Sequence, residues 1–139
     1  MNLKPYTFQY PVHGDQQEGF LFVANSVELN PFEIKRVFWT KETPMGVIRG
    51  RHAHYTTELV LIAISGKIMV KTFDKMGNYG CFELDIPAIG LYLPSMCWHE
   101  MTYTEDAVQL ALANSVYDES DYIRDINTFR KLIDITHVK

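Results

Sequence analysis

The sequence predicts an all-β protein with one helix at its C-terminus, and three observations lead to this fold class. Short runs rich in β-branched and aromatic residues recur at regular intervals along the chain. Residue pairs that contain glycine, proline or asparagine separate these runs. The last segment instead spaces its apolar residues as one face of a helix does. The cadence of short strands and turns is typical of a β-sandwich or a β-barrel.

The expected strands are short and fill most of the chain before the tail. In order they are residues 20–24, 34–40, 49–54, 59–64, 67–73, 80–84 and 89–93, a strand-like run that ends at Trp98-His99-Glu100, and residues 108–113. Turns are expected where glycine permits a positive φ or proline restricts it. These positions are Gly14-Asp15, Asn30-Pro31, Thr43-Pro44, Ser65-Gly66, Met76-Gly77-Asn78 and Ile86-Pro87.

The tail is expected to form one amphipathic helix over about residues 119–135 that packs on the β-barrel. Its apolar residues recur at helical spacing, at Tyr122, Ile126, Phe129, Leu132 and Ile133. Acidic residues at 118, 119 and 121 stand near the expected start, and basic residues at 130 and 131 stand near the end. This distribution of charge complements the helix dipole.

Length and composition bound the size and the partners of the protein. A chain of 139 residues supports one ordinary hydrophobic core, so a single domain over residues 1–139 is expected. The net charge of −4 provides no general attraction for nucleic acid. The apolar runs are far shorter than the roughly 20 residues that span a bilayer, which predicts a cytoplasmic protein without membrane contact. Cys81 and Cys97 lack zinc or redox spacing and are expected to be buried free thiols.

The segment Arg49–His54 combines strand character with two histidines. Side chains two residues apart in a strand share a face, so His52 and His54 are expected to point the same way and Ala53 the opposite way. His99 converges on this pair if its strand lines the same barrel. Arg36 with Lys35, and the arginines that flank the histidines, predict a basic lining suited to one small ligand, although Lys35 and Arg36 also fit a charged edge strand.

The histidine segment matches the first motif of the cupin superfamily, in which a glycine, five residues, His-x-His, three residues and a glutamate follow one another. Here those positions are Gly46, His52, His54 and Glu58, and residues 94–99 resemble the second motif, which adds His99. The resemblance implies a double-stranded β-helix, or jelly-roll, barrel. In metal-binding cupins these four positions ligate a divalent ion, so a metal-dependent enzyme that uses His52, His54, Glu58 and His99 is one alternative.

A closer resemblance covers the chain from about residue 31 to the C-terminus. Four motifs in the same order are similar to those of the dTDP-sugar 3,4-ketoisomerases of the WxcM-like cupin family: residues 49–54, 87–92, 98–101 and 117–124. The resemblance implies a homodimer with strand exchange near the N-terminus that acts without metal or cofactor. It also implies a dTDP-4-keto-6-deoxyhexose as substrate, whose carbonyl moves from C4 to C3 in the biosynthesis of amino sugars.

Moving a ketone to the adjacent carbon requires groups that exchange protons near neutral pH, and histidine does so unaided. On the resemblance, His54 is the favoured proton acceptor and His52 its acid/base partner. Arg36 and Arg49 would bind the pyrophosphate, and Trp98, His99 and Tyr92 would complete the substrate site. Each of these residues also has a purely structural alternative role: Arg49 as a partner in an ion pair, Trp98 as a core aromatic and His99 as a hydrogen-bonded histidine of the barrel.

Three positions depart from the family pattern. A family tyrosine that assists proton transfer is replaced within Phe38-Trp39, a glutamine by Leu59, and an arginine by Glu18. Tyr55, Tyr92 or Tyr103 are candidates to supply the missing hydroxyl. A ketoisomerase with a rearranged site therefore stands beside a catalytically altered dTDP-sugar-binding cupin, and 3,5-epimerase chemistry ranks below both because epimerases are longer and match less well.

Overall fold

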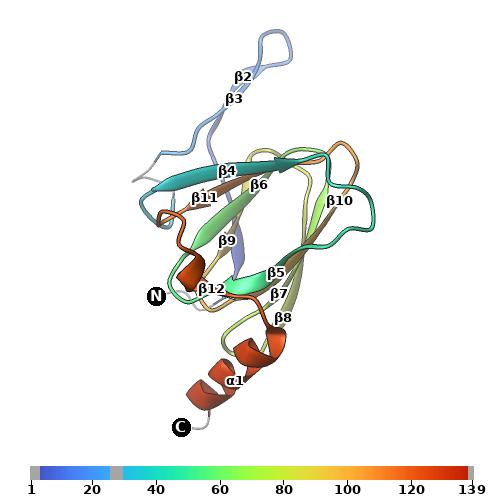
Figure 1. Ribbon diagram of the computed structural model, residues 1–139. Coiled ribbons are helices and arrows are strands. Elements are labelled where there is room, and N and C mark those ends of the chain that lie inside the picture. Colours follow the sequence, from blue (N-terminus) through green and yellow to red (C-terminus); the bar gives the residue numbers. More distant parts are fainter. Residues whose placement is uncertain (1–3, 26–29, 138–139) are drawn as a thin grey trace.

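Two five-stranded sheets face each other and form the barrel in Figure 1, a computed structural model that describes residues 4–25 and 30–137. The first sheet has the order β1-β9-β6-β11-β4, with β1 at Tyr6–Gln9, β9 at Ile89–Leu93, β6 at Leu59–Ser65, β11 at Val108–Ala113 and β4 at Arg36–Lys41. The second has the order β12-β5-β10-β7-β8, with β12 at Tyr122–Ile123, β5 at Arg49–His54, β10 at Trp98–Tyr103, β7 at Ile68–Phe73 and β8 at Tyr79–Leu84. Neighbouring strands pair antiparallel throughout.

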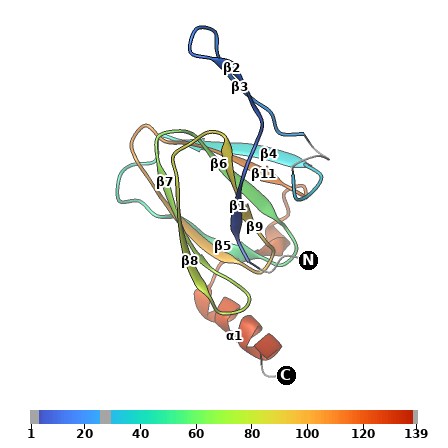
Figure 2. The same ribbon diagram turned by 180° about the vertical axis from the view of Figure 1, so that it is seen from behind.

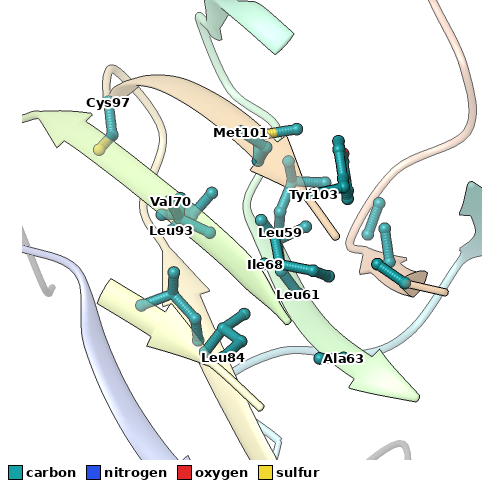
Figure 3. Packing of buried hydrophobic residues seen from close by; sticks show 14 residues of the cluster. Leu59, Leu61, Ala63, Ile68, Val70, Leu84, Leu93, Cys97, Met101 and Tyr103 are labelled. Atoms are coloured by element: carbon teal, nitrogen blue, oxygen red, sulfur yellow. The ribbon is translucent and has the colours of Figure 1, made fainter. Parts of the chain in front are cut away.

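The core lies between the two sheets and is made by alternate residues of the strands. Leu59 and Leu61 of β6 meet Ile68 and Val70 of β7, as Figure 3 shows, and Leu93 of β9 joins them. Each of these side chains is at most 3% exposed. The period of two along each strand therefore buries one face of each sheet in the barrel, and it also sets which polar residues turn inward.

A two-stranded hairpin stands apart from the barrel. It joins β2 at Val12–Asp15 to β3 at Gly19–Phe22 and extends away from the two sheets in both ribbon views (Figures 1 and 2). Every residue of both strands is exposed, including the three consecutive apolar residues Phe20, Leu21 and Phe22. An isolated two-stranded ribbon with apolar exposed side chains is marginally stable by itself.

The predicted all-β barrel with one C-terminal helix is confirmed, and most expected strands lie within two residues of the observed ones. Three strands were not anticipated: β1, β2 and the short β12. Two local expectations were wrong. Gly14-Asp15 belongs to β2, where Asp15 pairs with Gly19, rather than to a turn, and Trp98 opens strand β10 rather than lying near the end of a strand.

The expected helix start at residue 119 was wrong. Glu119–Asp121 is a single 3-10 turn, which the side chain of Asp118 caps by accepting from the backbone N–H of Ser120. Tyr122 and Ile123 then pair with His54 and Ala53 of β5, so Tyr122 lies in a strand. The helix α1 spans Ile126–His137, because Asp125 accepts from the backbone N–H of Thr128 and supplies the N-cap.

Helix α1 packs on the outer face of the second sheet. Phe129 and Ile133 of α1 contact Ala53 of β5, Trp98 of β10 and Ile123 of β12 in one buried cluster. Ala53 is fully buried here, which confirms that it points away from His52 and His54. The helix thus packs against β5 and β10 on the face opposite to their histidines.

Three sequence expectations concern the edge strand, the cysteines and membrane contact. β4 is an edge strand of its sheet, as the charged Lys35-Arg36 pair allowed. Both cysteines are free thiols, but only Cys97 is buried; Cys81 is exposed on the outer face of β8, so its predicted burial was wrong. Among the described residues, no helix combines the length and apolar character that a membrane crossing requires.

Candidate active site

Strands β5 and β10 bring three histidines together inside the barrel, as the sequence pattern predicted. His52 pairs directly with His99 across the two strands, and their ring centroids are 4.6 Å apart. The His54 ring lies 5.0 Å from His52 and 6.1 Å from His99. One ring nitrogen of each lies within 4.8 Å of the corresponding atom of the other two.

Gly50 makes the close approach of these two strands possible. Its φ is +84°, which favours glycine, and a Cβ at this position would lie 2.8 Å from the carbonyl oxygen of His99. The next residue, Arg51, also has a positive φ, of 58°. The irregular backbone here coincides with a register shift between His99 and Glu100. A β-bulge thus orients the histidine pair, which is a common role of bulges beside active sites.

The histidines line one pocket whose wall contains both apolar and polar side chains. Leu59 and Leu61 of β6 and Phe38 of β4 form apolar parts of the wall. The phenol of Tyr103 donates a hydrogen bond of 3.0 Å to the Gln109 side chain, and both residues also line the pocket. A mostly apolar cavity with a few convergent polar groups is the usual form of a small-molecule site.

The Nδ1 atom of each of the three imidazoles faces an oxygen that accepts hydrogen bonds. His52 Nδ1 lies 3.0 Å from the carbonyl oxygen of Gly50, and His99 Nδ1 lies 3.1 Å from that of Cys97. A carbonyl oxygen only accepts, so both Nδ1 atoms carry the proton and both Nε2 atoms carry a free lone pair. His54 Nδ1 instead faces a carboxylate oxygen of Asp121 at 3.6 Å.

Burial keeps all three imidazoles neutral near pH 7. Burial is the main cause that lowers the pKa of His52 to about 2, and the neighbouring His99 and His54 lower it further. Burial likewise lowers the pKa of His54 to about 3, although the Asp121 carboxylate opposes the shift. Burial lowers the pKa of His99 to about 4. Three neutral rings with inward lone pairs therefore offer the pocket proton acceptors rather than cations.

Asp121 lies beside His54 in a fixed position. Oδ1 accepts from the backbone N–H and the hydroxyl of Thr56, both at 2.9 Å. Oδ2 accepts from the backbone N–H of Thr57 at 3.1 Å and from the Thr57 hydroxyl. Burial raises the pKa of Asp121, but the hydrogen bonds from Thr57 and Thr56 outweigh burial, and the net pKa is lowered. The carboxylate therefore stays charged.

Of the two arginines predicted to bind pyrophosphate, only Arg49 is among the residues that line the pocket. Arg49 lines the pocket and is exposed. The Nε of Arg36 is buried and has no hydrogen-bond partner among the described residues, while its guanidinium lies 5.2 Å from the Phe38 ring centroid and 5.8 Å from that of Tyr117. An unpartnered guanidinium N–H is available for an anion.

Three other predicted residues lie outside the pocket. Trp98 packs against Phe129 of α1 and donates from Nε1 to Glu100, which matches the alternative of a core aromatic. Tyr92 belongs to a cluster on the outer side of its sheet and donates to the Glu58 carboxylate. Glu58 also accepts from the Asn114 side chain at 2.9 Å. The four cupin ligand positions thus do not converge, because Glu58 turns away where Leu59 turns inward.

Two residues that line the pocket, Tyr122 and Gln109, and one residue beside His54, Asp121, escaped the sequence reasoning. Tyr122 lines the pocket, with its ring centroid 4.4 Å from that of His54 and 5.0 Å from that of His52. The helical spacing of the tail assigned Tyr122 to the expected helix, although this residue belongs to the C-terminal motif. Asp121 belongs to the same motif. Gln109 had a local signal, since it is a polar residue within the apolar run of β11 and is 2% exposed.

Comparison with known proteins relates this site to one family. The family model described as "FdtA: WxcM-like, C-terminal" matches residues 4–134. The TDP-4-oxo-6-deoxy-alpha-D-glucose-3,4-oxoisomerase of Aneurinibacillus thermoaerophilus is 43% identical over 105 residues, which cover 74% of each chain.

Solved structures agree in fold over almost the whole chain. QdtA, a sugar 3,4-ketoisomerase from Thermoanaerobacterium thermosaccharolyticum solved in complex with TDP, has a TM-score of 0.90 at 29% identity and covers 98% of both chains. WlaRB, a TDP-quinovose 3,4-ketoisomerase from Campylobacter jejuni, has a TM-score of 0.84 at 34% identity and covers 90% of this chain and 95% of its own. The chain therefore belongs to the FdtA, WxcM-like C-terminal family, as its sequence motifs indicated.

Proposed function

We propose that the protein is a 3,4-ketoisomerase that moves the carbonyl of a TDP-4-keto-6-deoxyhexose from C4 to C3. The observation that carries this proposal is the cluster of three neutral imidazoles in one pocket of a chain that belongs to this family. The names of the relatives support the substrate class, since one acts on TDP-4-oxo-6-deoxyglucose and another was solved with TDP.

The proposed reaction needs one group of the protein that accepts a proton from the sugar and one that donates a proton to it. A base removes the proton from C3, and the electron pair of that C–H bond forms a C3–C4 double bond while the C4 carbonyl oxygen takes up the negative charge. The C4 oxygen takes up a proton and becomes a hydroxyl, the C3 hydroxyl loses its proton as the C3 carbonyl forms, and C4 receives a proton, so two protons leave the sugar and two return to it. Atoms and charge balance, and no oxidant or cofactor is required.

His54 is the proposed base, and His52 is its acid/base partner. A neutral imidazole with a free Nε2 lone pair accepts the C3 proton, and the Asp121 carboxylate then stabilises the imidazolium that forms. His99, from the facing strand, completes the polar wall. Arg36 and Arg49 are the proposed contacts of the substrate pyrophosphate, because the former has an unpartnered N–H and the latter is exposed at the pocket.

Tyr122 is the proposed hydroxyl in place of the missing family tyrosine. Phe38 lines the pocket without a hydroxyl, while Trp39 is exposed. Of the three candidates proposed from sequence, Tyr55 is exposed, Tyr92 lies outside the pocket, and the Tyr103 hydroxyl is bonded to Gln109. The Tyr122 ring contacts both histidine rings, which supports Tyr122 as the hydroxyl beside the proposed acid/base pair.

The decisive experiment follows solvent hydrogen into the sugar. Incubation of purified protein with TDP-4-keto-6-deoxyglucose in deuterated water should yield a 3-keto product with deuterium at C4, seen by NMR and mass spectrometry. His54→Asn should lower turnover on the order of 10²- to 10⁴-fold and leave TDP affinity, measured by calorimetry, within about twofold of wild type. Tight TDP binding without exchange or product in the wild type would leave a binding-only cupin as the function.

The same samples decide between this proposal and a metal-dependent enzyme. The three histidines could hold an ion, but Glu58 is engaged by Tyr92 and Asn114 and does not complete the four-residue set. We expect undiminished turnover after dialysis against a chelator, with less than 0.1 equivalents of iron, manganese, nickel or zinc by elemental analysis. Loss of turnover on chelation and its return with one added metal would contradict the proposal.

A homodimer is the proposed assembly, with a second copy of this chain against the β2–β3 hairpin. The apolar residues Phe20, Leu21 and Phe22 are 53%, 63% and 41% exposed on a ribbon that extends from the barrel (Figure 2). Trp39 and Val37 on the edge strand β4 are exposed at 67% and 47%. Contiguous exposed apolar residues on a projecting ribbon and on a sheet edge are features of an interface that is buried in the assembly.

A further inference from the structure

We propose that Tyr103 and Gln109 are positioning residues that hold the Arg49 guanidinium in place at the pocket, ready for the anionic part of the substrate. The role of Arg49 as an anion contact rests on the proposed function, whereas its attachment to the barrel is a feature of the structure alone. All three side chains line the pocket that also holds His52 and His99. Arg49 opens β5, Tyr103 ends β10 and Gln109 lies in β11.

The Tyr103 phenol connects the other two side chains. Tyr103 is 7% exposed and Gln109 is 2% exposed, and the phenol hydroxyl donates to Gln109 Oε1 over 3.0 Å. A phenol has one proton to donate, so its oxygen has only lone pairs left for a further partner. The Arg49 side chain is that partner and hydrogen-bonds the phenol. The donor order is therefore fixed, from guanidinium to phenol and from phenol to amide oxygen.

This anchor leaves the charge of Arg49 available to a ligand. Burial raises the pKa of the Tyr103 hydroxyl to about 12, although Arg49 and Gln109 oppose the shift, so the phenol is neutral at pH 7. Within the described part of the chain Arg49 forms no ion pair, in contrast to Arg124, whose Nε lies 2.7 Å from the Glu119 carboxylate. The sequence-based alternative of an ion pair for Arg49 is therefore wrong.

Anchoring matters because Arg49 is exposed. A free arginine side chain samples many rotamers, and an anion that binds it must first restrict them. A hydrogen bond to a phenol that a buried amide holds in place restricts the guanidinium before the ligand arrives. The guanidinium has five N–H donors, so one bond to the phenol leaves others for a phosphate oxygen. The pocket thus contains a cation that is already ordered.

The competing explanation is that Tyr103 and Gln109 serve only the stability of the barrel. Replacing both partners of a buried, uncharged hydrogen bond by apolar groups of similar shape is nearly neutral for stability. The double variant Tyr103→Phe with Gln109→Leu should therefore melt within about 5 °C of the wild type. A loss of ligand affinity in this folded variant would have no cause in global stability.

A double-mutant cycle on TDP affinity, measured by calorimetry, tests the inference. Arg49→Ala should lower the affinity about tenfold or more, because it removes a charge-assisted contact. The double variant Tyr103→Phe with Gln109→Leu should lower it about three- to tenfold, which is the effect of leaving one long side chain unrestrained. When Arg49→Ala is already present, the same two substitutions should change the affinity less than about twofold.

The matched control is Tyr92→Phe, which removes a phenol hydroxyl that is bonded to the Glu58 carboxylate outside the pocket, and it should keep wild-type TDP affinity. Wild-type affinity in Arg49→Ala, or in the double variant of Tyr103 and Gln109, would overturn the inference. An equal loss with and without Arg49→Ala would also overturn it, because the two residues would then act by a route other than Arg49.

Nitrogen relaxation of the arginine side chains tests the anchor in the wild type, without substitution or ligand. Arg51 is the internal comparison, because it is exposed in the same strand and its side chain has no hydrogen-bond partner among the described residues. We expect the Nε–H order parameter to lie above about 0.7 for Arg49 and below about 0.6 for Arg51. Equally low values would overturn the inference even if a variant failed to fold.

These readouts separate the inference from the proposed function. The expected coupling in a wild type that makes no 3-keto product would refute the function and leave the anchoring of Arg49 standing. Product formation without coupling in the cycle would refute the inference and leave the function. A wild type that does not bind TDP would overturn the inference, and turnover of the ketosugar would then decide the function independently.

Discussion

His52 and His99 are protonated at the same ring atom, Nδ1, because each of them contacts a nearby backbone carbonyl in the same way. Each Nδ1 is turned to the carbonyl two residues earlier in the chain, that of Gly50 for His52 and that of Cys97 for His99. The acceptor is thus supplied locally, and the sequence needs only strand geometry to fix both rings. His54 has no such carbonyl partner in the described part of the chain, and its Nδ1 instead faces Asp121 of the distant C-terminal segment at 3.6 Å, a neighbour that the histidine motif alone does not reveal.

The buried neutral histidines make the fold sensitive to mild acid. Their pKa values are lowered by burial to about 2 for His52, about 3 for His54 and about 4 for His99, against about 6.5 in an unfolded chain. Between pH 6.5 and about 4 the unfolded chain therefore binds more protons than the folded one, and stability falls as pH falls through this window.

We expect the free energy of unfolding, measured by urea denaturation, to drop from pH 6 to pH 5 by about 1 kcal/mol for each of the three imidazoles. His99→Gln should lose one such contribution, so its curve should be flatter over this interval by about 1 kcal/mol. The carboxylates with lowered pKa values, such as Asp121, act at lower pH and do not obscure the comparison. A wild-type free energy that is constant from pH 6 to pH 5 would contradict the neutral state of the cluster.

At the scale of elements, the approach of β5 to β10 decides the geometry of the site. Local propensity predicted both strands, but the bulge that sets their register was not readable from the sequence, because it depends on space between two strands. Gly50 shows the reason: its positive φ is a local property, whereas the 2.8 Å between its would-be Cβ and the His99 carbonyl oxygen is a tertiary one.

A comparison of two glycines with the same φ distinguishes the effect of backbone strain from the effect of the close approach between β5 and β10. Gly50 and Gly46 both have a φ of +84°, but a Cβ on Gly46 would meet nothing within 4 Å. Gly46→Ala should cost about 1 kcal/mol of stability through backbone strain alone and leave kcat unchanged. Gly50→Ala should cost at least about 1 kcal/mol more and lower kcat, because β5 must move away from β10. Equal destabilisation of the two variants, with equal kcat, would show that the close approach has no role.

The C-terminal segment illustrates how a tertiary contact overrides helical spacing. Tyr122 fits the apolar stripe of α1 in sequence, yet it pairs with His54 as part of β12. An exposed β5 edge offers backbone hydrogen bonds, and Ile123 gains a buried position between that strand and α1. These gains are not local to the segment, so the sequence-based boundary at residue 119 began the helix about two turns too early.

At the scale of the whole molecule, the projecting hairpin has no partner within the described part of the chain. The proposed dimer predicts that the wild type sediments as a dimer in analytical ultracentrifugation at micromolar concentration. The double variant Phe20→Ser with Leu21→Ser should sediment as a monomer. Tyr79→Ser is the matched control and should remain dimeric, because Tyr79 is 75% exposed and stacks on Phe73, whose ring also contacts Phe129 of α1. Helix α1 lies at the opposite end of the molecule from the hairpin in Figure 2.

Two results would contradict the proposed interface. One is a wild type that sediments as a monomer at concentrations well above those used for turnover. The other is a dimer that persists in the hairpin double variant, which would place the interface on another surface. If the double variant is monomeric and also inactive, the comparison of its TDP affinity with that of wild type shows whether a partner chain contributes to the substrate site.

The amino-acid sequence alone determined the class of fold, the inward direction of His52 and His54, and the family. These follow from side-chain alternation along strands and from short motifs, which are properties of neighbouring residues. Only the tertiary structure decided that Asp121 and Tyr122 join the histidines while Glu58, Tyr92 and Trp98 do not. The reason is that pairing of β12 with β5, and the side of each sheet that faces the barrel, depend on contacts between segments far apart in the chain.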